Sequence, residues 1–115
     1  MDIIIFFLIF FLGFIFVDTF KSKLSLKDIK NLKFLWVYHL IFGIYVCFFV
    51  PTDGVGYWQG AKNLTMQNIK ENIATYKGTE FMYVVHYFPS NYLDLSYFSG
   101  TMIYTLLGFI GICIF

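Results

Sequence analysis

Three long apolar stretches constrain the fold of this chain of 115 residues. They cover residues 3–17, 34–50 and 97–115, and none of them contains Asp, Glu or Lys. About 20 apolar residues cross the hydrocarbon core of a bilayer, with a range of roughly 17–25. A soluble domain carries about 25% charged residues, whereas this chain carries 13%. The sequence therefore predicts an all-α membrane protein.

We expect three transmembrane helices at about 3–20, 34–50 and 97–115, in a single membrane region that covers the whole chain. The first stretch could instead be a secretory signal peptide, which begins with a positive charge and ends at a small-residue cleavage site. Here Met1-Asp2 precedes the stretch and Val17-Asp18-Thr19 follows it. Neither end has the signal-peptide pattern, so the stretch is interpreted as a retained span.

The two connecting segments differ in charge, and this difference predicts the orientation. Residues 18–33 hold five Lys and two Asp, whereas residues 51–96 hold three Lys and four acidic residues. Lysine-rich short loops stay on the cytoplasmic side of a membrane. We therefore expect a cytoplasmic basic loop at 21–33, an outer loop at 51–96, an outside N-terminus and a cytoplasmic C-terminus in a bacterial inner (plasma) membrane.

Net charge and motif content exclude several classes of ligand. The formal net charge is +1, so no nucleic-acid-binding surface is indicated. The sequence has no phosphate-binding loop, zinc signature, nucleophile elbow or haem motif, and we expect no cofactor and no metal site. Cys47 and Cys113 lie in apolar runs near opposite faces of the membrane, so we expect no disulfide between them.

The outer loop 51–96 has the pattern of short interfacial helices. Apolar residues recur close to helical spacing and predict helices at about 57–63 and 66–76. Thr65 is the expected cap of the second helix, and Gly78 is its expected C-terminal stop. Such helices lie in the interface plane with their apolar side toward the lipid.

Other segments carry shorter signals. Glu80–Phe88 is apolar and aromatic but too short to span, which favours a re-entrant or interfacial segment. Pro89-Ser90-Asn91 predicts a turn. In the basic loop, Ser25 is the expected cap of a local helix, with Asp28 near the positive end of that helix.

Candidate site residues gather in Pro51–Gly60, which directly follows the second apolar run and is rich in turn residues. Asp53 could act as a general base or orient a sugar hydroxyl, or it could cap the helix that follows. Tyr57 and Trp58 could stack on a sugar ring, or they could anchor the chain in the membrane interface.

Three further residues carry ionisable groups of interest. Lys62 and His86 could bind a phosphate, or each could simply be exposed. His39 lies inside the second apolar run, about 9 Å beyond Lys33 at 1.5 Å per residue. An ionisable residue in a span is a functional candidate by default, and a ligand or proton-relay role competes with a neutral imidazole that is hydrogen-bonded to a neighbouring helix.

Two short stretches carry a resemblance to a known family. They are Pro51-Thr52-Asp53-Gly54-Val55-Gly56-Tyr57-Trp58 and Leu95-Ser96-Tyr97-Phe98-Ser99-Gly100. With the expected layout, they resemble the N-terminal portion of bacterial exopolysaccharide and O-antigen repeat-unit polymerases of the EpsG/Wzy type. The resemblance implies transfer of a growing glycan from a polyprenyl-diphosphate carrier onto another repeat unit, with Asp53 as the catalytic residue and Tyr57 beside it. That family has more spans and catalytic basic residues in a large outer loop, so we expect this chain, which has no Arg, to be the first part of a longer protein.

The predicted function is therefore a part in cell-envelope glycan assembly, and whether this chain is itself an enzyme is left open. The alternative is a small non-enzymatic membrane subunit, or a transporter fragment, that packs against partner helices. Ser96, Gly100 and Gly108 share a face of the third run, and small residues let helices approach closely in lipid. The expected partners are the lipid bilayer, a polyprenyl-diphosphate-linked glycan and further transmembrane helices of the same or another chain.

Overall fold

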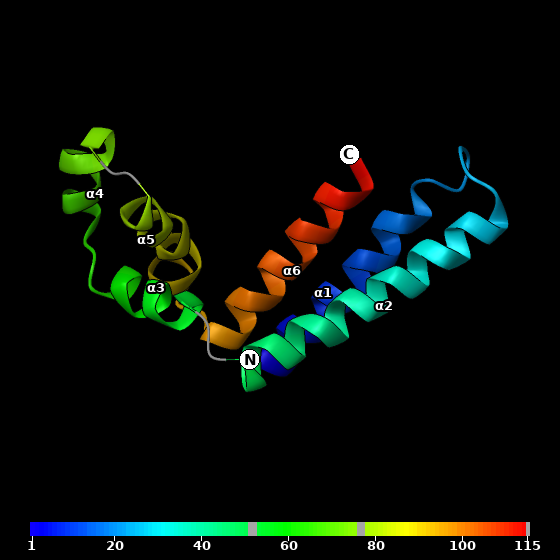
Figure 1. Ribbon diagram of the computed structural model, residues 1–115, viewed down its shortest axis with the longest axis horizontal. Coiled ribbons are helices and arrows are strands. Elements are labelled where there is room, and N and C mark those ends of the chain that lie inside the picture. The colour runs from blue at the N-terminus through cyan, green and yellow to red at the C-terminus, as the bar shows by residue number, and fades with distance from the viewer. Residues whose placement is uncertain (51–52, 76–77, 115) are drawn as a thin grey trace. The chain divides into compact units, whose positions relative to one another are not determined.

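Helices make up most of the described residues, and no strand occurs among them, in a computed structural model (Figure 1), which confirms the all-α prediction. The structure describes residues 1–50, 53–75 and 78–114. The chain divides into two compact units, each described by itself below. Unit 1 combines Met1–Val50 with Thr101–Phe115, and unit 2 is Pro51–Gly100.

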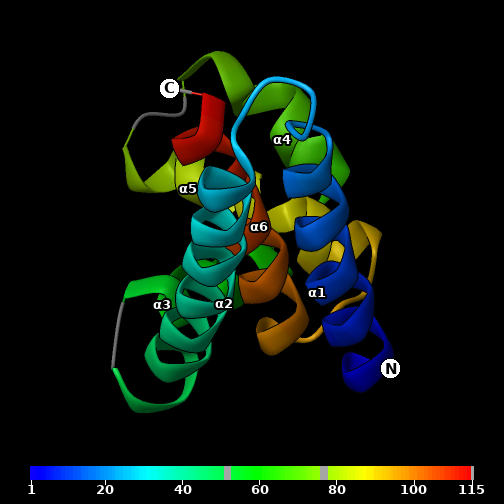
Figure 2. The ribbon, with the colours of Figure 1, turned by 90° about the vertical axis from the view of Figure 1, so that its right-hand side faces the viewer.

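Unit 1 contains two antiparallel helices and most of a third. They are α1 (Asp2–Asp18), α2 (Leu26–Phe49) and α6 (Tyr97–Ile114). A turn at residues 19–25 joins α1 to α2, and α6 lies beside the pair in both ribbon views (Figure 1, Figure 2). The three apolar stretches of the sequence thus form the three helices of this unit.

An aromatic contact between the three helices forms the core of unit 1. Trp36 of α2 is fully buried, and its ring centroid lies 5.0 Å from that of Phe109 of α6. The Trp36 indole Nε1 donates a hydrogen bond of 3.0 Å to the carbonyl oxygen of Phe10 in α1. Gly13 of α1 leaves the space for the indole, because a Cβ atom at that position would overlap the ring.

α2 begins after the predicted cap and is continuous with the expected span. Ser25 is the predicted cap: its hydroxyl oxygen accepts the backbone N–H of Asp28 at 3.2 Å and donates to the Asp28 carboxylate at 2.6 Å. The helix then continues from Leu26 into the apolar stretch without a break, because Lys is a good helix former and no Gly or Pro interrupts its first four turns. Residues 26–33 of the expected basic loop are therefore helical, as the predicted cap at Ser25 implies, and they are continuous with the helix of the second apolar stretch.

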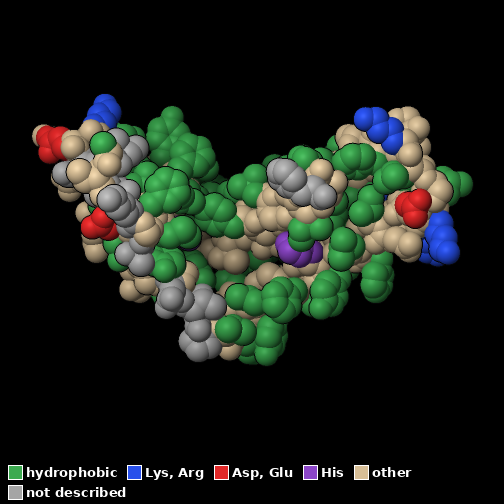
Figure 3. Space-filling model, turned by 45° about the horizontal axis from the view of Figure 1, so that its top comes forward, with side chains coloured by type: hydrophobic (Ala, Val, Ile, Leu, Met, Phe, Trp, Pro, Cys, Tyr) green, Lys and Arg blue, Asp and Glu red, His purple; other side chains and the backbone are tan. Residues whose placement is uncertain are grey.

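Two of the helices, α2 and α6, are long and apolar enough to cross a membrane. Of their most apolar 18 residues, 11% are buried in α2 and 22% in α6. A helix in the core of a soluble protein is mostly buried, so α2 and α6 leave more apolar surface exposed than such a helix does. α1 is shorter, with 17 residues. The charged side chains of unit 1 that Figure 3 shows gather at the end of the 19–25 turn, and hydrophobic side chains cover much of the rest of the visible face. Unit 1 is thus compatible with a membrane protein.

Unit 2 is a set of short helices in which α3 packs against α5. It contains α3 (Asp53–Lys62), α4 (Met66–Asn72) followed by a 3₁₀ turn (Ile73–Thr75), α5 (Thr79–Tyr87) and a π-helical turn (Phe88–Tyr92). The first helix begins at Asp53, four residues before the predicted start. The predicted cap of the second helix is confirmed, since the Thr65 hydroxyl accepts the backbone N–H of Asn68 at 3.2 Å.

Three predictions around α5 meet different outcomes. The apolar segment 80–88 is helical over most of its length, as α5. The predicted turn at Pro89-Ser90-Asn91 is instead part of the π-helical turn, because Pro89 has no N–H for an α-helical bond. Gly78 has a φ of 57° and precedes α5, while Tyr76, in the predicted end of the preceding helix, lies outside the described residues.

Candidate functional site

Three of the predicted site residues meet where α3 packs against α5. Tyr57 and Trp58 are neighbours on α3, and the ring of His86 on α5 lies 6.0 Å and 6.2 Å from their ring centroids. Tyr83, which precedes His86 by about one turn, has its ring 6.0 Å from that of Tyr57. We call Tyr57, Trp58, Tyr83 and His86 the aromatic cluster.

The local sequence explains why these rings meet. Tyr83 and His86 are three residues apart in α5, so they share one face of the helix. Gly60 follows Tyr57 by about one turn in α3, and a Cβ atom at Gly60 would lie 2.7 Å from the Tyr83 ring. The missing side chain at Gly60 therefore lets α5 approach α3 closely enough to bring the cluster together.

Trp58 is the buried member of the aromatic cluster. It is 5% exposed, and its ring stands edge-on to that of Tyr97 at 5.8 Å. A Cβ atom at Gly100 would overlap the Trp58 indole. Trp58 thus packs inside unit 2, while Tyr57 and Tyr83 are half-buried.

His86 is buried, at 9% exposed, and its ring orientation is held by a hydrogen bond. Its Nδ1 lies 2.8 Å from the Met82 carbonyl oxygen, and because a carbonyl only accepts, Nδ1 carries the proton in this bond. The Ser90 hydroxyl donates to the His86 carbonyl oxygen at 2.7 Å. The imidazole is therefore a fixed part of the cluster and not an exposed side chain.

Asn91 links the π-helical turn to the end of α3. Its Nδ2 donates to the carbonyl oxygens of Ala61 at 3.0 Å and Leu64 at 3.2 Å. Helix C-termini leave such carbonyls without intrahelical partners. The sequence predicts only a turn at Asn91, and no local pattern indicates acceptors that lie about thirty residues earlier.

The remaining two candidates of unit 2 lie apart from the buried rings. Lys62 is exposed at the last residue of α3, and its ammonium forms no ion pair with any residue that the structure describes. Asp53 is the first residue of α3, and its side chain lies outside the described part of the structure.

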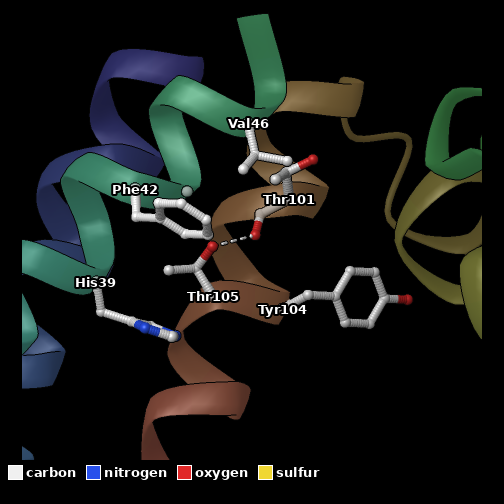
Figure 4. Close-up of a pocket in the computed structure, with 7 residues that line it drawn as sticks. His39, Phe42, Val46, Thr101, Tyr104 and Thr105 are labelled. Atoms are coloured by element: carbon white, nitrogen blue, oxygen red, sulfur yellow. Dashed lines mark hydrogen bonds between the residues drawn. The ribbon is translucent and has the colours of Figure 1, made fainter. Parts of the chain in front are cut away.

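A second candidate site is a groove of about 260 Å³ in unit 1, between α2 and α6. Its lining includes His39, Phe42 and Val46 from α2 and Thr101, Tyr104 and Thr105 from α6 (Figure 4). The Thr105 hydroxyl donates to the Thr101 carbonyl oxygen at 2.9 Å, so it is used within its own helix.

His39 is the ionisable residue of this groove. It is half-buried, its ring lies 6.2 Å from that of Phe109, and its Nε2 lies 3.6 Å from the place of a Cβ atom at Gly108. The expected hydrogen bond from the imidazole to a neighbouring helix is not formed among residues 1–50, 53–75 and 78–114. His39 therefore offers a hydrogen-bonding group to a partner in the groove.

No group of three or more His, Cys, Asp or Glu that could hold a metal ion occurs in the described residues. Cys47 and Cys113 are free thiols. Comparison with protein-family models, with curated proteins and with solved structures gives no match to this chain. Its function is therefore argued from the aromatic cluster and the groove.

Proposed function

We propose that this chain is an integral membrane protein of bacterial cell-envelope glycan assembly and that unit 2 binds the glycan of a polyprenyl-diphosphate-linked repeat unit. The aromatic cluster carries the proposal. In it, the half-buried Tyr57 and Tyr83 stand beside the hydrogen-bonded His86. The unit that holds them lies along the chain between two helices that are long and apolar enough to cross a membrane.

The chemistry of a sugar fits this arrangement. Aromatic rings pack against the apolar C–H surface of a sugar, while phenol and imidazole groups hydrogen-bond its hydroxyls. A carrier lipid keeps its glycan near the bilayer surface, where a unit inserted between two spans can reach it. Asp53, four residues before Tyr57 in α3, is the proposed general base for transfer.

The proposed placement has α1, α2 and α6 as three spans of the inner membrane, with unit 2 outside. The lysine distribution supports this orientation, because five Lys fall within residues 18–33. In a background with Cys47 and Cys113 replaced by Ala, a membrane-impermeant thiol reagent should modify Q67C in intact cells and should leave S25C unmodified. The reverse labelling pattern would exclude an outer glycan site.

The glycan role is tested in the native host, with the gene deleted and then supplied as variants. We expect Tyr57→Ala and Asp53→Asn to shorten the surface glycan, and Gln59→Ala, an exposed position on α3, to leave its length unchanged. Immunoblotting checks that the variants reach the membrane in equal amounts. Surface glycan of normal length in the deletion strain would refute the proposed function.

The groove favours a second function, that of a non-enzymatic subunit. An unsatisfied polar group in hydrocarbon costs several kcal/mol, and a polar side chain from a partner helix would satisfy His39. We expect His39→Leu to reduce co-purification of a membrane partner, and Tyr45→Leu, an exposed position on α2, to have no such effect. Equal partner yields from the two variants would remove this alternative.

A further inference from the structure

The end of unit 1 that joins α1 to α2 carries lysines without acidic partners. Lys23, Lys27 and Lys30 are exposed and form no ion pair within the part of the chain that the structure describes. We call these three residues the lysine face. With 3.6 residues per turn, Lys27 and Lys30 lie about 60° apart around α2, whereas Asp28 lies about 160° from Lys30.

The two acidic residues of this end are already engaged. Asp18 Oδ1 lies 2.7 Å from the Lys33 ammonium and 3.2 Å from that of Lys21. The Asp28 carboxylate accepts the Ser25 hydroxyl at 2.6 Å. The lysine face therefore keeps its positive charge unpaired.

Exposed leucines accompany the lysine face. Leu26 is 87% exposed and Leu24 is 39% exposed. Leu26 precedes Lys30 by four residues in α2, so the two share one face of the helix. Exposed leucine beside exposed lysine is typical of a segment at a lipid interface, where the apolar side chain enters the acyl boundary and the ammonium reaches the headgroups.

We propose that the lysine face, together with Leu24 and Leu26, is a binding site for the anionic headgroup of a phospholipid. The site lies at the polar end of α2, which is long and apolar enough to cross a membrane. Residues 18–33 contain five Lys and two Asp, so this end of unit 1 has a net positive charge that complements an anionic headgroup. Because the chain has no Arg, recognition is by point charges and not by a bidentate fork. The inference needs α2 in a membrane and is independent of the glycan role.

The test titrates the full chain in a neutral detergent with dioctanoyl-phosphatidylglycerol and with dioctanoyl-phosphatidylcholine by calorimetry. Each Lys near anionic lipid contributes a factor of about five in affinity, so we expect the phosphatidylglycerol to bind between about tenfold and a hundredfold more tightly. The double variant K27Q/K30Q should lower this ratio by up to about 25-fold. The charge-conserving variant K27R/K30R and the unit 2 control K70Q, at an exposed position on α4, should keep it.

Two further arms identify what is bound. Glycerol phosphate without acyl chains should bind much more weakly than the phosphatidylglycerol, and the variant Leu26→Ser should weaken both lipids while keeping their ratio. Equal affinity for the two lipids, an unchanged ratio in K27Q/K30Q, or glycerol phosphate binding as tightly as the lipid would each overturn the proposal. Circular dichroism verifies that the variants keep their helices, and none of these outcomes depends on glycan length in cells.

Discussion

Replacing Asn91 with Ala should loosen the C-terminal end of α3 without changing the charge of unit 2. The carboxamide Nδ2 lies 3.0 Å from the Ala61 carbonyl oxygen and 3.2 Å from the Leu64 carbonyl oxygen. A carboxamide has two N–H donors, so both bonds can form at once. At about 1 kcal/mol net for each bond, the loss is at most about 2 kcal/mol, since water can reach the half-buried Asn91. This corresponds to an increase of up to about thirtyfold in the opening equilibrium of α3.

Amide hydrogen exchange of the full chain, reconstituted in lipid nanodiscs, measures this opening in residues 53–64. Asn91→Asp is a second test, because a carboxylate has no N–H to donate and is repelled by the carbonyl oxygens. Asn63→Ala, at an exposed position next to α3, is the matched control. If exchange in α3 is as slow in Asn91→Ala as in Asn63→Ala, the cap does not hold α3 and the reasoning is wrong.

Gly13→Ala and Asp18→Asn test unit 1, and Gly56→Ala in α3 of unit 2 is the comparison for the first of them. Gly13→Ala should lower the free energy of unfolding by about 1–3 kcal/mol because its Cβ would overlap the Trp36 indole, while Gly56→Ala, with nothing within 4 Å, should raise it by about 0.5–1 kcal/mol. Thermal denaturation followed by circular dichroism compares them, and equal effects would contradict the packing argument. Asp18 is the last residue of α1, and its carboxylate forms ion pairs of 2.7 Å with Lys33 and 3.2 Å with Lys21. These ion pairs stabilise the fold while the carboxyl group is ionised, and they are lost when acid protonates it. Asp18→Asn should flatten the pH dependence of unfolding below about pH 4, and an unchanged acid profile would refute this role.

Local sequence signals succeed where the deciding interaction lies within one helical turn. The hydroxyl groups of Ser25 and Thr65 each accept a hydrogen bond from the backbone amide three residues later. Both partners of each cap are therefore close together in the sequence and can be recognised there. The cap at Ser25 marks the start of α2, but its continuation into the span from residue 34 is not predicted, because a run of lysines marks polarity and polarity alone does not stop a helix. The helix continues wherever no residue breaks it.

The packing of unit 2 is beyond local signals. Trp58 has the same amphipathic ring whether it lies at a membrane interface or in a core. Its burial requires the space beside Gly100, which is about forty residues away in the sequence. Asn91 likewise caps a helix that ends long before it in the chain. The candidate residues Tyr57 and His86 can be selected from the sequence, but their meeting depends on Gly60 opposite Tyr83.

The indole-to-carbonyl bond between Trp36 and Phe10 has a consequence for biosynthesis. Both residues come before unit 2 in the chain, so this hairpin can close while the residues that follow it are still being translated. Phe109, whose ring completes the contact, is made much later, after all of unit 2. The nascent chain must therefore keep a hydrophobic surface of the hairpin uncovered until α6 has been made.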